Sequence, residues 1–137
     1  MPINSSILAL DVGDVRVGAA LANSHSMLAQ PLITLTNDAQ FIDQIKEIID
    51  QNKVELVVVG LPRNLDGNDT AQTQKVREFT DLLRTKIFVK IEYQDEALSS
   101  VRAREAVLAG DKHTDIDALA ASYILDDYLT ENNLTTK

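Results

Sequence analysis

Residues 7–18 read Ile7-Leu8-Ala9-Leu10-Asp11-Val12-Gly13-Asp14-Val15-Arg16-Val17-Gly18. The run from Ile7 to Leu10 has no polar break, which predicts a central strand buried on both faces. Gly13-Asp14 predicts a short hairpin turn in which glycine supplies a positive φ, and a second strand is expected from Val15 to Leu21. The stretch therefore sets one carboxylate, Asp11, at the end of a central strand. The simpler interpretation is a hairpin in which Asp11 only ends that strand.

Composition limits the class of protein. A chain of 137 residues predicts one domain, residues 1–137, large enough to bury a proper core. No apolar run approaches the roughly 20 residues of a membrane span, and residues 1–6 lack the basic and apolar regions of a signal peptide. We therefore expect a cytoplasmic protein without a membrane partner. The absence of cysteine agrees with that compartment and excludes thiolate zinc sites, iron–sulfur clusters and cysteine nucleophiles.

The formal net charge of −8 argues against a protein that coats nucleic acid non-specifically. Such affinity comes largely from lysine and arginine side chains that neutralise phosphates. The charge argues less against an enzyme, because carboxylates that hold divalent cations present a positive site once the metal is bound.

The remaining sequence predicts alternating strands and helices. After the hairpin we expect a strand over 31–36, then a helix with apolar residues from Phe41 to Ile49, capped by Asn37 or Asp38 and ending near Asn52. A strand over 54–59 follows, then a helix opened by a capping box of Asp69 and Gln72, and a strand near the sheet edge over 87–94. The last two elements are helices, one from Ser99 or Ser100 to Gly110 and one over 115–129. Three strands joined by short turns, then two reached through helices, predict a mixed five-stranded α/β sheet with helices on both faces.

Acidic residues stand where the predicted parallel strands end. Asp11 ends the first strand and Asp95-Glu96 end the fifth, and ligands of open α/β sheets bind at that edge. Because adjacent residues of a strand point to opposite faces, one of Asp95 and Glu96 can share a site with Asp11, and we favour Glu96.

Asp117 is a third candidate, in the first turn of the last predicted helix. It lies on the side of Ala120 and Ile124, which faces the body of the protein. The alternative is a structural role, because Thr114 and Asp117 have the spacing of a capping box and an acid in a first turn is favoured by the helix dipole. Three inward carboxylates would need cations or protons to coexist, and hard oxygen ligands suit Mg²⁺ or Mn²⁺.

Four sequence blocks together resemble the YqgF/RuvX family, Holliday-junction-resolvase-like proteins of the RNase H-like superfamily. The blocks are Leu10-Asp11-Val12-Gly13 with Arg16 and Gly18; Val58-Val59-Gly60-Leu61-Pro62 with Asn64, Asp66 and Gly67; Asp95-Glu96 with Leu98-Ser99-Ser100; and Ile116-Asp117-Ala118 with Ala120-Ala121, Ile124-Leu125 and Tyr128-Leu129. They span nearly the whole chain, and their order makes the resemblance specific.

The resemblance implies an RNase H-like fold and a metal-dependent nuclease, either an endonuclease or an exonuclease. The expected substrate is the 5′ end of pre-16S rRNA, in a ribosomal precursor particle, or branched DNA. The implied catalytic set is Asp11, Asp95, Glu96 and Asp117, with two Mg²⁺ or Mn²⁺ ions held by Asp11, Glu96 and Asp117. Expected substrate contacts are Arg16, Arg63, Asn64, Ser99 and Ser100.

Two departures from the family pattern leave alternatives open. Asp14 and Val15 stand where the family has threonine and lysine, and Ala97 stands where it has arginine, so two positive charges are missing. Either phosphate is bound elsewhere or activity is weaker or altered. The candidates for phosphate binding are Arg16, Arg63, Arg102, Arg104 and Lys112. The alternative function is a non-catalytic RNA- or protein-binding module, whereas an actin-like ATPase would need a second domain that this length does not hold.

Overall fold

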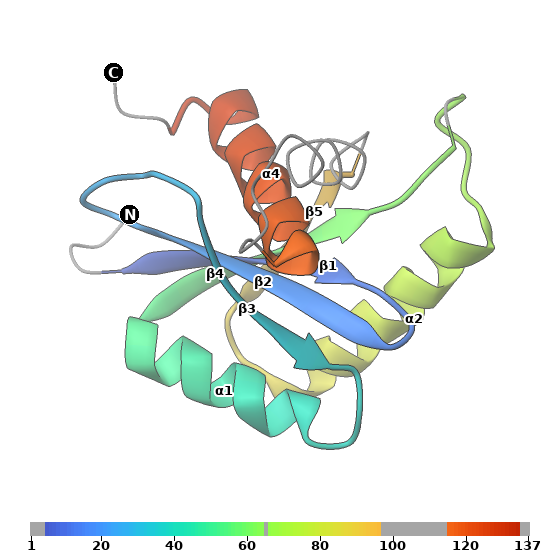
Figure 1. Ribbon diagram of the computed structural model, residues 1–137, viewed down its shortest axis with the longest axis horizontal. Helices are drawn as coiled ribbons and strands as arrows, with labels where there is room; N and C mark the ends of the chain where they lie inside the picture. The colour runs from blue at the N-terminus through green and yellow to red at the C-terminus, as the bar shows by residue number, and fades with distance from the viewer. Residues whose placement is uncertain (1–4, 65, 97–114, 135–137) are drawn as a thin grey trace.

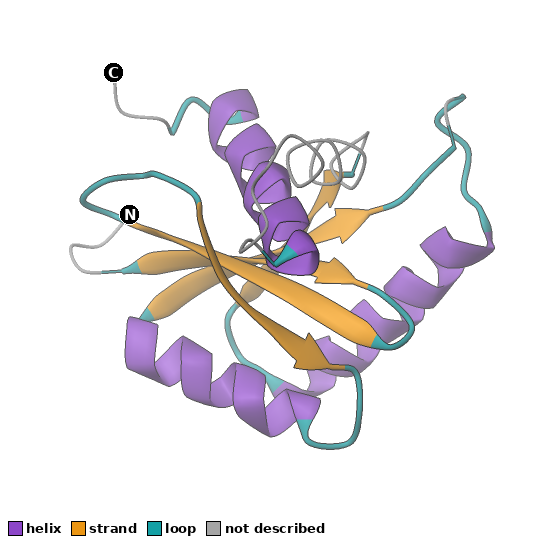
Figure 2. Cartoon of the chain, viewed as in Figure 1, coloured by secondary structure: helices purple, strands orange, loops and turns teal. Residues whose placement is uncertain are grey.

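The computed structural model describes residues 5–64, 66–96 and 115–134. In chain order the elements are β1 (Ser6–Val12), β2 (Arg16–Asn23), β3 (Gln30–Thr36), α1 (Phe41–Asn52), β4 (Val54–Leu61), α2 (Ala71–Lys86), β5 (Lys90–Asp95) and α4 (Ile116–Glu131). Figure 2 shows how these strands and helices alternate. The helix predicted from Ser99 or Ser100 to Gly110 falls outside the described residues. No helix in the described ranges is both long and apolar enough to cross a membrane.

The five strands form one mixed sheet in the order β3-β2-β1-β4-β5. The β1–β2 and β2–β3 pairs are antiparallel, whereas β4 is parallel to both β1 and β5. This arrangement confirms the predicted sheet, including the position of β5 at its edge. It brings the carboxyl ends of β1, β4 and β5 to one side of the molecule.

Helices cover both faces of the sheet (Figure 1). Along β1, alternate side chains pack in opposite directions, as a strand requires. Leu8 and Leu10 join the apolar cluster beneath α1 and α2, while Ile7 and Ala9 pack against α4 on the other face. All four are fully buried, and each large apolar side chain contributes roughly 1.5–3 kcal/mol to the free energy of unfolding. The residue two positions after Ala9 is Asp11, which therefore lies on the α4 face.

The turn after β1 differs from the prediction. Val12 pairs with Val17, and the Gly13 N–H donates to the carbonyl oxygen of Arg16 at 2.9 Å, so the turn is centred on Asp14 and Val15. Val15 is 66% exposed in this turn instead of belonging to β2. Gly13 does not have a positive φ, but a Cβ atom there would lie 2.8 Å from the Arg16 carbonyl oxygen. Glycine is needed for close backbone approach rather than for a left-handed conformation.

The helix starts also correct the sequence analysis. The N-cap of α1 is Gln40 without a side-chain cap, and Asp38 instead accepts from the Gln40 N–H at 2.9 Å in the preceding turn. The capping box of α2 pairs Thr70 with Thr73, not Asp69 with Gln72. Because α2 continues to Lys86 and Ile87 is its C-cap, β5 begins at Lys90, later than predicted. Several polar residues near each helix start fit the capping pattern, so the sequence alone did not identify the N-cap residue.

The C-terminal half of α4 is fixed to β5 by polar side chains. The Tyr128 hydroxyl donates to Glu92, and Gln94 Nε2 donates to Glu131 Oε2 at 2.7 Å. Gln94 is buried, so this bond satisfies a polar group that packing has removed from water. At the other end of α4, the first turn packs against the backbone of β2 at Gly18. Contacts at both ends therefore fix the position of α4 over the sheet.

Candidate active site

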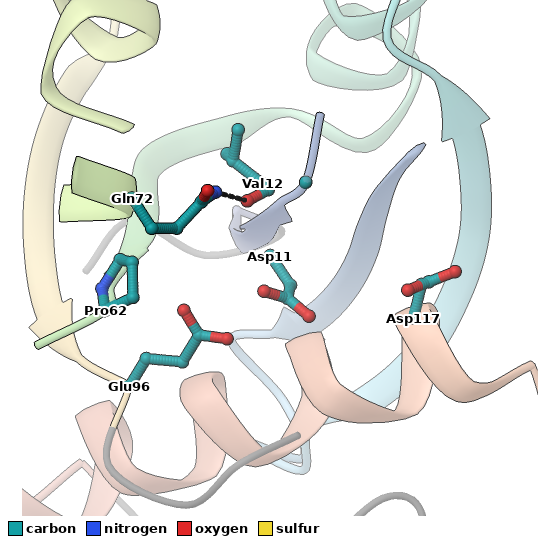
Figure 3. A pocket seen from close by; sticks show the side chains of 7 residues that line it. Asp11, Val12, Pro62, Gln72, Glu96 and Asp117 are labelled. Carbon is teal, nitrogen blue, oxygen red and sulfur yellow. Dashed lines mark hydrogen bonds between the residues drawn. The ribbon is translucent and has the colours of Figure 1, made fainter. Parts of the chain in front are cut away.

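A pocket of about 320 Å³ opens at the carboxyl ends of β1 and β4. Its lining residues come from β1 and the following turn, the segment after β4, the first turn of α2, the end of β5 and the first turn of α4: Asp11, Val12, Gly13, Pro62, Gln72, Glu96 and Asp117. Figure 3 shows the carboxyl group of Asp11 between those of Glu96 and Asp117. Three acidic side chains that the sequence separates widely thus line one cavity.

The surroundings of Asp11 change its pKa. Burial raises the pKa of Asp11 above its ordinary value of 3.8, and the negative charge of Asp117 adds to that rise. A hydrogen bond with Glu96 opposes the rise. A hydrogen bond between two carboxyl groups requires a proton on one of them. Without a cation, this pair therefore holds a proton more tightly than an exposed carboxyl group does.

Glu96, rather than Asp95, lines the pocket. The Glu96 N–H donates to the Leu61 carbonyl oxygen at 3.1 Å, which continues the β4–β5 pairing by one residue and fixes the backbone there. Asp95 points elsewhere: its Oδ1 lies 3.6 Å from Nη1 of Arg63, and its side chain is 64% exposed. Asp95 is not among the residues that line the pocket, and its catalytic role stays a prediction.

Asp117 reaches the pocket from the first turn of α4. The N-cap of that helix is Asp115, whose Oδ1 accepts from the Asp117 N–H at 3.1 Å. Thr114, the other member of the capping box considered from the sequence, lies outside the described residues. The Asp117 side chain is 26% exposed and accepts from Arg16 Nε at 2.8 Å through Oδ2. Arg16 is the first residue of β2. The ion pair therefore joins the second strand to the last helix.

Sequence reasoning missed the part of the wall that α2 supplies. Gln72 Nε2 donates to the Val12 carbonyl oxygen at 3.5 Å, as Figure 3 shows, and the buried Thr73 hydroxyl donates to the Pro62 carbonyl oxygen. These bonds brace the end of β1 and the segment after β4 against one helix turn. The sequence offered only a capping pattern at Gln72, which gave no sign of a contact 60 residues away.

Two other expected substrate contacts, Arg63 and Asn64, lie outside the pocket lining. Arg63 pairs with Asp69 at 3.3 Å as well as with Asp95, and Asn64 Oδ1 accepts from the N–H groups of Asp66 and Asn68 in its own loop. Both side chains thus have structural partners. Ser99, Ser100, Arg102, Arg104 and Lys112 lie outside the described residues.

The donor chemistry fits a divalent cation at Asp11 and Glu96. A cation would offset the negative charge of these neighbouring carboxyl groups, and carboxylate oxygens are the ligands that Mg²⁺ and Mn²⁺ prefer. Within the described residues, no group of three acidic or histidine side chains is arranged to hold one ion. Asp117 is near the pair, but Arg16 neutralises it.

The RuvX family profile, described as Holliday junction resolvase, matches residues 5–131. The chain belongs to the RuvX family. Among the relatives of this RuvX chain, a Clostridium botulinum (strain Hall) protein named "Putative pre-16S rRNA nuclease" is 36% identical over 130 residues, which are 90% of this chain and 95% of the relative. A Clostridium kluyveri protein of the same name is 35% identical over 130 residues, with the same coverage of both chains.

Solved structures confirm the RNase H-like fold of the RuvX chain. RuvC of T. thermophilus in complex with a Holliday junction substrate superposes with a TM-score of 0.57 at 13% identity, covering 95% of this chain and 97% of that one. The fowlpox virus resolvase in complex with Holliday junction DNA gives a TM-score of 0.55 at 12% identity, covering 95% and 99%. At such identity the likeness concerns the fold alone.

Proposed function

We propose that this protein is a metal-dependent nuclease that hydrolyses phosphodiester bonds at the 5′ end of pre-16S rRNA. The observation that carries the proposal is that three carboxyl groups, those of Asp11, Glu96 and Asp117, line one pocket at the strand ends (Figure 3). The names of the family and of its relatives support a nuclease role. Branched DNA is the second substrate to test, because the family is described as Holliday junction resolvase.

The residues in and around the pocket would have different roles in such a reaction. Asp11 and Glu96 would hold Mg²⁺ or Mn²⁺, and Asp117 is the third carboxylate within the same cavity. When bound, these ions activate a water molecule and stabilise the leaving oxygen of a phosphodiester. Gln72 and Thr73 keep the pocket wall in place, and the Asp115 cap orients the first turn of α4. Preorganised geometry of this kind lowers the cost of positioning reactants.

A non-catalytic RNA-binding module is the alternative function. The Arg16–Asp117 ion pair favours it, because a carboxylate that is already neutralised contributes less to a cation site. The cleavage experiment below separates the two functions.

The test is cleavage of an end-labelled RNA that carries the 5′ extension of 16S rRNA, and of a four-way DNA junction, with Mg²⁺ or with chelator. We expect cleavage with Mg²⁺ that Asp11→Asn or Glu96→Gln reduces about a hundredfold or more, roughly 2.7 kcal/mol of transition-state stabilisation. The matched control is Asp14→Asn, because Asp14 is exposed and pairs with Lys75 at 3.3 Å outside the pocket. Equal cleavage by Asp11→Asn and wild type, or full cleavage in chelator, would contradict the proposal.

A further inference from the structure

The backbone of Arg16 is fixed in the sheet, whereas its side chain is largely exposed. The backbone lies in β2, where Arg16 pairs with Thr36 of β3 and its carbonyl oxygen accepts from the Gly13 N–H. The side chain is 63% exposed, whereas that of Asp117 is 26% exposed. The guanidinium can therefore leave Asp117 without any change in the sheet.

The contact between the two side chains uses one N–H group. Arg16 donates through Nε to Asp117 Oδ2, and among the residues that the structure describes Asp117 is the one carboxylate with which this guanidinium pairs. Ion pairs with one exposed partner contribute little to stability, because water and salt screen them. Each of the two side chains can therefore exchange its partner for an ion of higher charge density.

The position of this pair makes the exchange matter for the pocket. Asp117 lines the cavity together with Asp11 and Glu96, so a cation bound there competes with the Arg16 guanidinium for the same carboxylate. The guanidinium in turn is a donor that matches the geometry of a phosphate group. A phosphate at the mouth of the pocket would offer Arg16 a second anionic partner.

We propose that Arg16 is a positioning residue that couples nucleic-acid binding to cation binding. In the free protein it neutralises Asp117. When a nucleic-acid strand enters, the guanidinium moves to a backbone phosphate and Asp117 becomes a ligand for the cation. This inference rests on the proposed function, since it takes the pocket to bind both a cation and a phosphodiester. Linkage then requires that each ligand strengthens the binding of the other.

The first test measures Mg²⁺ affinity by isothermal titration calorimetry without nucleic acid. We expect Arg16→Gln to bind Mg²⁺ about threefold to fivefold more tightly than wild type, as the loss of an exposed competing ion pair allows. Lys75→Gln is the matched control: it removes the same charge beside the same turn, but its partner Asp14 lies outside the pocket. A change no larger than that of Lys75→Gln, or weaker Mg²⁺ binding by Arg16→Gln, would overturn the inference.

The second test measures the coupling itself. The Mg²⁺ titration is repeated with a short single-stranded phosphorothioate oligoribonucleotide, which resists hydrolysis. We expect the oligonucleotide to tighten Mg²⁺ binding to wild type and to have less effect on Arg16→Gln, while Arg16→Lys retains part of the coupling. Equal coupling in wild type and Arg16→Gln would show that Arg16 does not transfer between partners.

These measurements separate the inference from the proposed function. If wild type binds no Mg²⁺, both fail. If it binds Mg²⁺ and cleaves RNA but Arg16→Gln shows neither effect, only the inference fails. Thermal unfolding of each variant checks that the fold is intact, and Arg16→Lys, which retains the charge, serves if Arg16→Gln does not fold.

Discussion

A Cβ atom on Gly18 of β2 would lie 1.9 Å from the carbonyl oxygen of Asp117, so the first turn of α4 rests directly on the strand backbone. Gly18 pairs with Asp11 across β1 and β2. The absence of a side chain at position 18 therefore sets how closely Asp117 approaches Asp11.

Gly18→Ala should displace the first turn of α4. We expect the free energy of unfolding to fall by about 1–3 kcal/mol, the usual cost of adding atoms to a packed contact, and cleavage to fall further than stability explains. Urea unfolding and cleavage rates at equal folded fraction check this. Gly67→Ala is the comparison, because its φ of 79° strains any side chain but nothing lies within 4 Å of a Cβ atom there. It should lose stability while cleavage stays normal, and the same pattern in Gly18→Ala would contradict the prediction.

Asp11→Asn should make the cation-free protein more stable at neutral pH. Burial raises the pKa of Asp11, so between its unfolded-state and folded-state pKa the folded protein binds more protons at this group than the unfolded chain does. Wild-type stability from this group is therefore greatest below its ordinary pKa of 3.8 and declines as the pH rises through the folded-state pKa. Asparagine has no proton to release. In chelator, the stability advantage of Asp11→Asn should grow between about pH 4 and pH 7. A difference that stays constant over this interval would contradict the assigned pKa direction.

Asp115→Ala and Asp117→Asn should separate capping from cation binding. Asp115→Ala removes the N-cap of α4 and should lower the free energy of unfolding by about 1 kcal/mol. Asp117→Asn should change it less, because the lost ion pair is offset by reduced repulsion of Asp11. Wild type should gain about 1.4 kcal/mol at ten times the dissociation constant of Mg²⁺. With the phosphorothioate oligoribonucleotide present, so that Arg16 is engaged by phosphate, we expect thermal melts to show that gain intact in Asp115→Ala and reduced in Asp117→Asn. A gain that is reduced in Asp115→Ala and intact in Asp117→Asn would remove Asp117 from the proposed site.

Arg63→Gln should leave the salt dependence of nucleic-acid binding unchanged. Its guanidinium is occupied by Asp69 and Asp95, whereas each lost phosphate contact lowers the salt slope by about 0.7 for a single strand. Fluorescence anisotropy over a range of salt concentrations measures the slope. Arg16→Gln, measured alongside, should lose about one such contact. A comparable loss in Arg63→Gln would restore Arg63 as a phosphate-binding residue.

The sheet could be predicted because its signals are local. The apolar run at the start of β1, the alternation in β5 and the helical spacing between them predicted a mixed five-stranded sheet through general rules of connection. The turn at Asp14 and Val15 and the caps at Gln40 and Thr70 could not, since several nearby polar residues satisfy the same local pattern. Packing between distant elements decides among them.

In the candidate site, too, local patterns predicted some features and not others. Alternation along the strand was enough to favour Glu96 over Asp95 as the neighbour of Asp11. The pairing of Arg16 with Asp117 and the bracing by Gln72 depend on how α4 and α2 pack, which no local pattern encodes. The catalytic roles of Asp11, Glu96 and Asp117 stay predictions.

The Arg16–Asp117 ion pair joins residues 101 positions apart, which bears on how the chain is synthesised. The strands β1 and β2 leave the ribosome long before α4 exists, so a nascent chain carries Asp11 without its acidic neighbours. Closing this loop costs conformational entropy, and contacts between residues far apart in the sequence slow folding. The third carboxylate of the pocket, Asp117, would thus join Asp11 and Glu96 only as α4 docks on the sheet.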